Sequence, residues 1–257
     1  MARHGAWRPG GALRDLRTLV QHRELLAGMV ARELRGRYRQ SVLGVAWSIL
    51  TPLLRTAVFT LVFSVFARFP SDGVPYPLFA LAALLPWGLF TTAVSSGVTS
   101  LTAQASLVSK LSFPREILPL AAIAASGLEF AIGLAIYAGM FVLYGLPVTW
   151  AAALAVPVLL IELGLVVGLT FLLSVANVYY RDVTHALSIL FQPWMYLTPV
   201  VYPLSMVPEQ YRTLYCLNPM VGIVDGFRAA AGRGQMPDLS ALGYSLVVSV
   251  AVLVVGY

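Results

Sequence analysis

The chain has 257 residues, of which 59% are hydrophobic and 11% are charged, and its formal net charge is +6. Soluble domains contain about a quarter charged residues, so this composition excludes an ordinary soluble protein and predicts an integral membrane protein. The single cysteine, Cys216, excludes an internal disulfide and a CxxC redox or zinc site. No apolar core with a cleavage site opens the chain, so we expect no signal peptide.

Residues 1–46 hold nine arginines and three acidic residues, which accounts for the whole positive excess. A basic block beside a membrane span is expected to contact anionic lipid headgroups rather than nucleic acid. Within it, residues 13–34 predict an amphipathic helix lying on the inner membrane surface, with Leu26, Met29 and Val30 on its apolar face. A soluble helix that packs on a partner is the alternative. We therefore expect residues 1–46 to form a cytoplasmic or interfacial segment.

Residues 47–257 predict an all-α transmembrane domain of six helices. The expected spans are residues 47–67, 77–98, 117–143, 148–176, 184–201 and 239–257. Segments on the same side as the N-terminus carry twelve Lys or Arg residues, against four on the other side. This bias predicts a multi-pass protein with both termini in the cytoplasm.

Residues 203–236, between the fifth and sixth spans, contain an apolar stretch, residues 217–232, that is too short to cross the membrane twice. Asn218-Pro219 divides them, because a proline cannot continue an incoming helix. We expect a re-entrant hairpin of helices near the outer face. Irregular backbone at this depth needs protein or a water-filled cavity beside it, which favours a transport pathway.

The motifs of an enzyme are absent from the sequence. A P-loop needs a lysine after glycine, and the only lysine, Lys110, follows Ser109. The three histidines form no HExxH motif. We therefore expect no catalytic residue, metal or cofactor in this chain, and any ATP hydrolysis would belong to a different subunit.

Three charged residues fall inside predicted spans: Arg55, Glu129 and Glu162. Ionisable groups at this depth cost a few kcal/mol or more and need partners. An Arg–Glu pair that locks helices together is the favoured interpretation. Contact of Arg55 with an anionic substrate headgroup and a proton relay through the two carboxylates are the alternatives.

Several aromatic residues lie within or near the spans, away from the interfacial belts, and could form a wall along a conduit. They are Trp87, Phe90, Phe191, Trp194, Tyr196 and Tyr202. Helix packing explains each of them equally well.

Residues 101–116 connect the second and third spans on the cytoplasmic side. They predict a short helix closed by Pro114, with Lys110 and Arg115 exposed. Such a protrusion could receive force from a soluble partner, whereas an ordinary surface loop is the alternative.

Five motifs in this order resemble the membrane subunit of ABC transporters that export polysaccharides such as O-antigen, capsule and teichoic acid. They are RGRYRQSVLGVAW (35–47), LVSKLSFPREILP (107–119), NVYYRDV (177–183), TPVVYP (198–203) and NPMVGIVDGFR (218–228). The likeness covers almost the full chain. Arg55 matches no family role.

The resemblance implies a homodimer in the bacterial cytoplasmic membrane, bound to two copies of a separate ATPase that uses ATP and Mg²⁺. The substrate would be a glycan on a polyprenyl pyrophosphate lipid, moved through an aromatic-lined channel at the subunit interface. The lipid pyrophosphate would enter beside Arg35, Arg37, Tyr38 and Arg39. The coupling helix would present Ser109, Lys110, Phe113, Pro114 and Arg115 to the ATPase.

Two rival functions stay open. An ABC permease of this kind could export a drug or a small lipid instead of a glycan. An ion-coupled secondary transporter could use Glu129 and Glu162, although the two halves of the chain show no repeat. A membrane glycosyltransferase is a more distant alternative, because no acidic metal-binding cluster lies in a loop.

Overall fold

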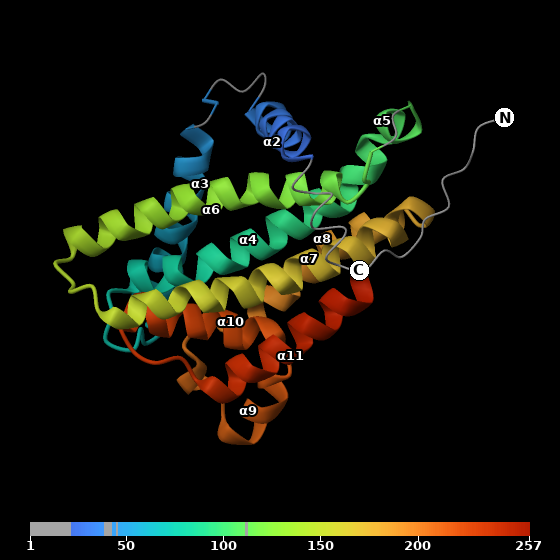
Figure 1. Cartoon of the computed structure of the whole chain (residues 1–257). Coiled ribbons are helices and arrows are strands. Elements are labelled where there is room, and N and C mark those ends of the chain that lie inside the picture. The colour runs from blue at the N-terminus through green and yellow to red at the C-terminus, as the bar shows by residue number, and fades with distance from the viewer. Residues whose placement is uncertain (1–21, 39–42, 45, 111–112) are drawn as a thin grey trace.

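The computed structural model describes residues 22–38, 43–44, 46–110 and 113–257, and this part of the chain contains helices and no strands (Figure 1). Four long helices form the body of the molecule. They are α4 (Tyr76–Ala103), α6 (Ile117–Leu143), α7 (Ala155–Tyr179) and α11 (Leu239–Gly256). Helix α4 packs between α6 and α7, and α11 packs on the other side of α7.

Helix α4 is the centre of the bundle, and most of its side chains are buried. Small residues allow the neighbouring helices to approach closely, as is common where lipid supplies no hydrophobic drive between helices. The clearest case is Gly168 of α7, where a Cβ atom would lie 2.6 Å from backbone atoms of Leu253 in α11. An alanine at this position would push the two helices apart.

Among the described residues, five segments are long and apolar enough to cross a membrane, which makes this a multi-pass membrane protein. They are Ala46–Phe66, Tyr76–Ala103, Ile117–Leu143, Trp150–Tyr179 and Leu239–Gly256. The first combines α3 (Ala46–Phe59) with the π-helix η1 (Thr60–Phe66), and the fourth combines the 3₁₀ helix η2 (Trp150–Leu154) with α7. Almost none of the first segment is buried within the chain, and in Figure 1 α3 crosses α4 and α6 steeply instead of running alongside them.

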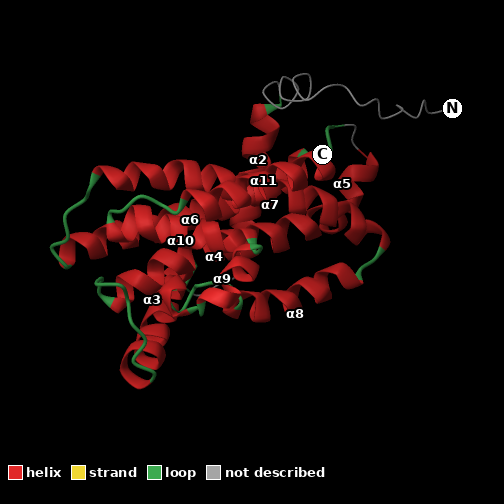
Figure 2. Ribbon diagram, turned by 90° about the horizontal axis from the view of Figure 1, so that it is seen from below, coloured by secondary structure: helices red, strands yellow, loops and turns green. Residues whose placement is uncertain are grey.

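The segment predicted as the fifth span, residues 184–201, differs from the other five. It covers most of α8 (Asp182–Tyr196), which has 15 residues, none of them buried. A helix of this length rises about 22 Å, less than the hydrocarbon core of about 30 Å. Figure 2 shows α8 running along one side of the bundle, and turns over residues 197–202 follow it.

Residues 203–236 form short helices, as the prolines predict. They are η3 (Leu204–Met206), α9 (Glu209–Cys216), α10 (Pro219–Phe227) and the π-helix η4 (Arg228–Arg233). The break between α9 and α10 falls at Asn218-Pro219, where we predicted it. Helix α10 is buried from Met220 to Phe227 and packs against α4, α7 and α11.

Two further helices lie outside this body. Helix α2 (Arg23–Tyr38) packs against α6 through a face that includes Leu26, Met29 and Val30, each half-buried. The part of the predicted 13–34 helix before residue 22 lies outside the described residues. Helix α5 (Ala105–Lys110) lies beyond α4, at the end of the bundle where the C-terminus also lies (Figure 1).

Candidate functional site

Arg37, in the last turn of α2, ties this helix to the body of the protein. Its Nη1 lies 3.1 Å from Oε2 of Glu129 on α6. Its Nη2 donates hydrogen bonds to the hydroxyls of Ser96 on α4, at 2.9 Å, and Ser126 on α6, at 3.2 Å. Glu33, one turn earlier in α2, lies 3.4 Å from Nε. One guanidinium group thus joins three helices.

This ion pair explains how a carboxylate is tolerated inside α6. Glu129 lies 12 residues beyond Ile117, so it is about 18 Å along the helix. An unpaired charge at such a depth is costly, and pairing with hydrogen bonds offsets part of that cost. An Arg–Glu pair between helices was our favoured interpretation of the buried charges, but the arginine is Arg37 and not Arg55.

A smaller, partly open pocket of about 330 Å³, called the inner cavity below, lies between α3, α4 and α6. Arg37, Arg55 and Glu129 all line it, together with hydroxyl groups and apolar side chains of the three helices. The Arg55 side chain is exposed at its wall. Within the described residues, Arg55 has no ion pair and no hydrogen bond.

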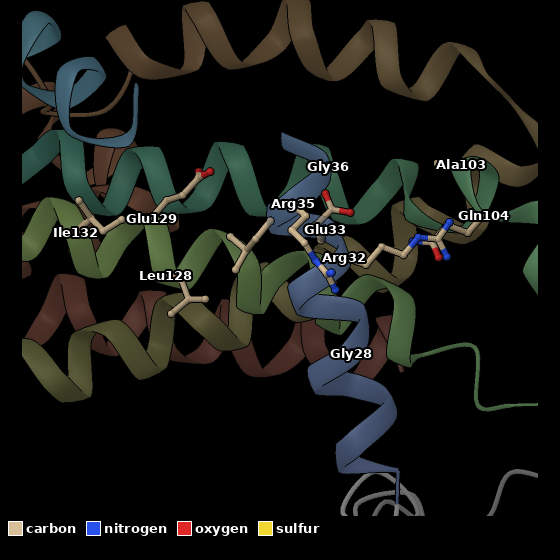
Figure 3. Close-up of a pocket in the computed structure, with 11 residues that line it drawn as sticks. Gly28, Arg32, Glu33, Arg35, Gly36, Ala103, Gln104, Leu128, Glu129 and Ile132 are labelled. Carbon is tan, nitrogen blue, oxygen red and sulfur yellow. The ribbon is translucent and has the colours of Figure 1, made fainter. Parts of the chain in front are cut away.

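A larger cleft, of about 1340 Å³, lies between α2, α6 and the end of α4 (Figure 3). Arg32 and Arg35 line it from α2, and in Figure 3 Arg32 extends toward Gln104 at the end of α4. Glu129 lines this cleft as well as the inner cavity. The Arg37–Glu129 pair therefore lies where the two spaces meet.

The other two predicted entrance residues come at the end of α2 and directly after it in the sequence. Tyr38 is the last residue of α2. Arg39 lies outside the described residues. Of the four basic-stretch residues predicted to meet a pyrophosphate, Arg35 lines the cleft and Arg37 lines the inner cavity.

Four of the predicted channel aromatics form one cluster between α4 and α8. The ring centroid of Trp194 on α8 lies 6.3 Å from that of Trp87 and 5.2 Å from that of Phe90, both on α4. The ring centroid of Phe191 on α8 lies 5.6 Å from that of Phe90. Trp87 and Phe90 are buried, so they hold the helices together. Phe191 and Trp194 are half-buried and keep part of their surface free.

The remaining two aromatics lie after α8. Tyr196 is exposed, and its carbonyl accepts a hydrogen bond of 2.7 Å from the Tyr202 hydroxyl. The Tyr202 hydroxyl is also 2.6 Å from that of Tyr215 in α9. These contacts fix the turn that links α8 to α9.

Asn218 connects this cluster to the short helices. Its Oδ1 accepts hydrogen bonds from the backbone N–H of Met220 and from Nε1 of Trp194, each at 3.0 Å. Its Nδ2 donates to the carbonyl of Leu197 and the hydroxyl of Thr198. The asparagine before the proline therefore caps α10 and holds the end of α8. The sequence predicted the break at Asn218-Pro219 but neither of these contacts.

Arg228 is a second residue whose role the sequence did not reveal. Only 1% of its surface is exposed. Its guanidinium carbon lies 3.8 Å from the ring centroid of Phe79 on α4. Its Nη2 donates to the carbonyls of Pro199 and Val200, at 2.7 and 2.9 Å. It thus joins the TPVVYP motif (198–203) to the NPMVGIVDGFR motif (218–228).

An ion-pair cluster around Arg233 was also missed. Arg233, at the end of η4, lies 2.9 Å from Asp72 in the loop before α4 and 3.3 Å from Asp225 in α10. Ser205 donates a further hydrogen bond to Asp72. The cluster fastens the loop between the first two spans to the buried short helices.

Asn177 explains part of the NVYYRDV motif. Its side chain, near the end of α7, donates to the carbonyl of Val98 on α4 at 3.3 Å. It also accepts a 2.8 Å hydrogen bond from the hydroxyl of Thr184 on α8. Three helices are joined at this end of the bundle.

The last predicted residues make fewer contacts. Glu162 on α7 is fully buried, and neither carboxyl oxygen has a hydrogen-bond partner among the described residues. Ser109 and Lys110 end α5, while Phe113 and Pro114 are half-buried and Arg115 is exposed. The linker therefore offers a short helix and an exposed cation at one end of the bundle.

Comparison with known proteins decides the family. Residues 24–231, which run from α2 to η4, match the family described as ABC-2 type transporter. The chain belongs to the ABC-2 type transporter family. The matched region of this ABC-2 protein contains both cavities, the aromatic cluster and the Arg228 contacts.

Several relatives of this ABC-2 protein are similar over most of their length. An O-antigen export system permease protein RfbA from Myxococcus xanthus is 36% identical over 244 residues, which are 94% of this chain and 93% of the relative. An RfbA permease of Klebsiella pneumoniae is 27% identical, covering 83% of this chain and 82% of the relative. The polysialic acid transport protein KpsM of Escherichia coli is 25% identical and covers 88% of each chain.

Proposed function

We propose that this ABC-2 protein is the permease that exports a polyprenyl-pyrophosphate-linked polysaccharide across the bacterial cytoplasmic membrane. The observation that carries this proposal is its full-length similarity to O-antigen and polysialic acid transport proteins. Two copies of the chain form the pathway, and two copies of a separate ATPase bind ATP and Mg²⁺ beneath it. This chain itself binds no cofactor. Both termini lie in the cytoplasm.

In this proposal α8 is a sixth, shortened span, and α9 with α10 re-enters from the outer face. The buried turn residues Thr198 to Val201 continue α8 toward that face. The polar ends of α10 have partners within the protein, because Asn218 caps its start. Irregular backbone at membrane depth needs such hydrogen-bond partners for its N–H and C=O groups.

The glycan follows a channel between the two subunits. Phe191, Trp194, Tyr196 and Tyr202 line half of it, while Trp87 and Phe90 support the wall from behind. Aromatic faces contact the apolar faces of sugar rings without fixing one position. The partial exposure of the α8 aromatics supports this arrangement.

The lipid pyrophosphate enters at the cleft under α2. Arg32 and Arg35 line this cleft, and Arg39 with Tyr38 continues the basic stretch. Guanidinium groups bind phosphate oxygens in pairs, which suits this headgroup. The cytoplasmic linker with Phe113, Pro114 and Arg115 receives the motion of the ATPase.

The test is depletion of the chain in the organism that encodes it. Loss of a surface polysaccharide, together with accumulation of its lipid-linked form inside the cell, is the expected result. Normal surface glycan with increased drug sensitivity would instead favour a drug or small-lipid exporter. Re-expression of the wild-type chain is the control.

A further inference from the structure

The inner cavity between α3, α4 and α6 carries a surplus of positive charge. Arg37 and Arg55 line it, and Glu129 is the single carboxylate among the described lining residues. Hydroxyl groups of the same walls can donate further hydrogen bonds. They belong to Thr51, Thr92 and Ser126. The cavity therefore offers cationic and neutral donors but too few anionic acceptors.

Arg55 is the group that creates this surplus. It is the tenth of the 21 residues in the segment Ala46–Phe66, near the middle of a span. Cations at this depth are costly and pair with anions. Arg37 has Glu129, Glu33 and two serines as partners, whereas Arg55 has none within the described residues.

We propose that this cavity binds a phosphate or pyrophosphate group between Arg55 and Arg37. Two guanidinium groups on different helices can hold the oxygens of one such group from two sides. The bound anion supplies the missing partner of Arg55 and competes with Glu129 for Arg37. That the anion is the headgroup of a transported lipid rests on the function proposed above.

The position of Glu129 gives this site a connection to the surface. Glu129 lines both the inner cavity and the large cleft under α2. An anion that enters between Arg32 and Arg35 reaches the Arg37–Glu129 pair before it reaches Arg55. Arg37 therefore exchanges Glu129 for the anion as the anion moves into the inner cavity.

Binding to the purified full-length chain in uncharged detergent tests the proposal. The probes are inorganic pyrophosphate, farnesyl pyrophosphate and farnesol, measured by thermophoresis at constant ionic strength. We expect Arg55→Gln to weaken farnesyl pyrophosphate binding by about tenfold or more, because a charged hydrogen-bond donor is lost. Arg55→Lys keeps the charge and loses less. Arg23→Gln removes an exposed arginine of α2 that lines neither space, and serves as the matched control.

A second pair of variants tests the cavity itself. Gly88 lines it, and a Cβ atom there would meet nothing within 4 Å, so Gly88→Val adds volume to the cavity from an unobstructed Cβ position. Gly127 on α6 also has open space around its Cβ position but lines neither cavity nor cleft. We expect Gly88→Val to reduce binding severalfold and Gly127→Val to leave it unchanged.

The outcomes separate the possibilities. Binding of both pyrophosphates supports the site and assigns it to the phosphate group, while binding of farnesyl pyrophosphate alone supports it and assigns a lipid headgroup. Equal affinity of wild type and Arg55→Gln, no binding to wild type, or equal binding of farnesol overturns it. Dissociation of a dimer by Arg55→Gln also overturns it, because Arg55 then pairs with the second copy. The assay contains no ATPase, so it can succeed even where glycan export fails.

Discussion

The guanidinium of Arg228 lies 3.8 Å from the ring centroid of Phe79, and Arg228 itself is almost fully buried. The same group donates to the carbonyls of Pro199 and Val200. These carbonyls follow α8, where prolines leave backbone acceptors without helical partners. One side chain of η4 thus fixes the end of α8 against α4.

Replacing Arg228 tests this role. Arg228→Met keeps the apolar stem but removes the donor, so two buried carbonyls lose their partner. We expect a loss of about 2–3 kcal/mol in the free energy of unfolding, measured in detergent. The lysine variant keeps a donor and is expected to lose less. Equal stability of wild type and Arg228→Met would contradict the assigned role.

The Arg37–Glu129 pair predicts energetic coupling between α2 and α6. Arg37→Ala and Glu129→Ala are each expected to destabilise the protein, and the double variant is expected to lose less than their sum. Both side chains keep some solvent contact, so we expect a coupling of about 1–2 kcal/mol. A double-mutant cycle of unfolding free energies measures it. Strict additivity would mean that the pair does not attach α2.

Asn218 is expected to matter beyond its role as a helix cap. Loss of an N-cap costs about 1 kcal/mol, and Asn218→Ala also removes the acceptor of Trp194. Asp238 caps α11 without such a contact, so Asp238→Ala is the matched control. Tryptophan fluorescence should shift for Asn218→Ala and stay unchanged for the control. An unshifted spectrum for Asn218→Ala would argue against the contact.

Substitutions in the linker after α5 are expected to uncouple ATP hydrolysis from transport. Replacing Phe113 and Pro114 by alanine should leave ATP hydrolysis by the partner subunit in place while export falls by about tenfold or more, because the proposed contact surface is lost. Met206→Ala, exposed among the short helices that follow α8, is the control. Unchanged transport per ATP hydrolysed would remove the linker from the coupling pathway.

The sequence predicted those parts of the fold that depend on local composition. The segments that contain α4 and α6 were predictable because an apolar run of membrane length has few alternatives. The end of α8 was not recognised, although Pro199 carries the signal. The run from Thr184 to Val201 was predicted to cross, but Thr198 precedes this proline and is disfavoured in a helix.

The contacts of the candidate site were harder to predict, because they depend on how helices cross. A buried carboxylate at Glu129 predicts an arginine partner but does not identify it. Arg55, in a neighbouring span, was the obvious choice, whereas Arg37 reaches Glu129 only because α2 packs against α6. The motif around Arg228 was recognised as a pattern, and its contact with Phe79 required three-dimensional packing.

The central claim is that this chain forms a passage driven by a separate ATPase. The most direct measurement is translocation of a polyprenyl-pyrophosphate glycan in vesicles that contain the chain with and without that ATPase. We predict ATP-dependent movement with both proteins present and none with the chain alone. Movement by the chain alone under a proton gradient would contradict the account and favour an ion-coupled carrier that uses Glu129 and Glu162.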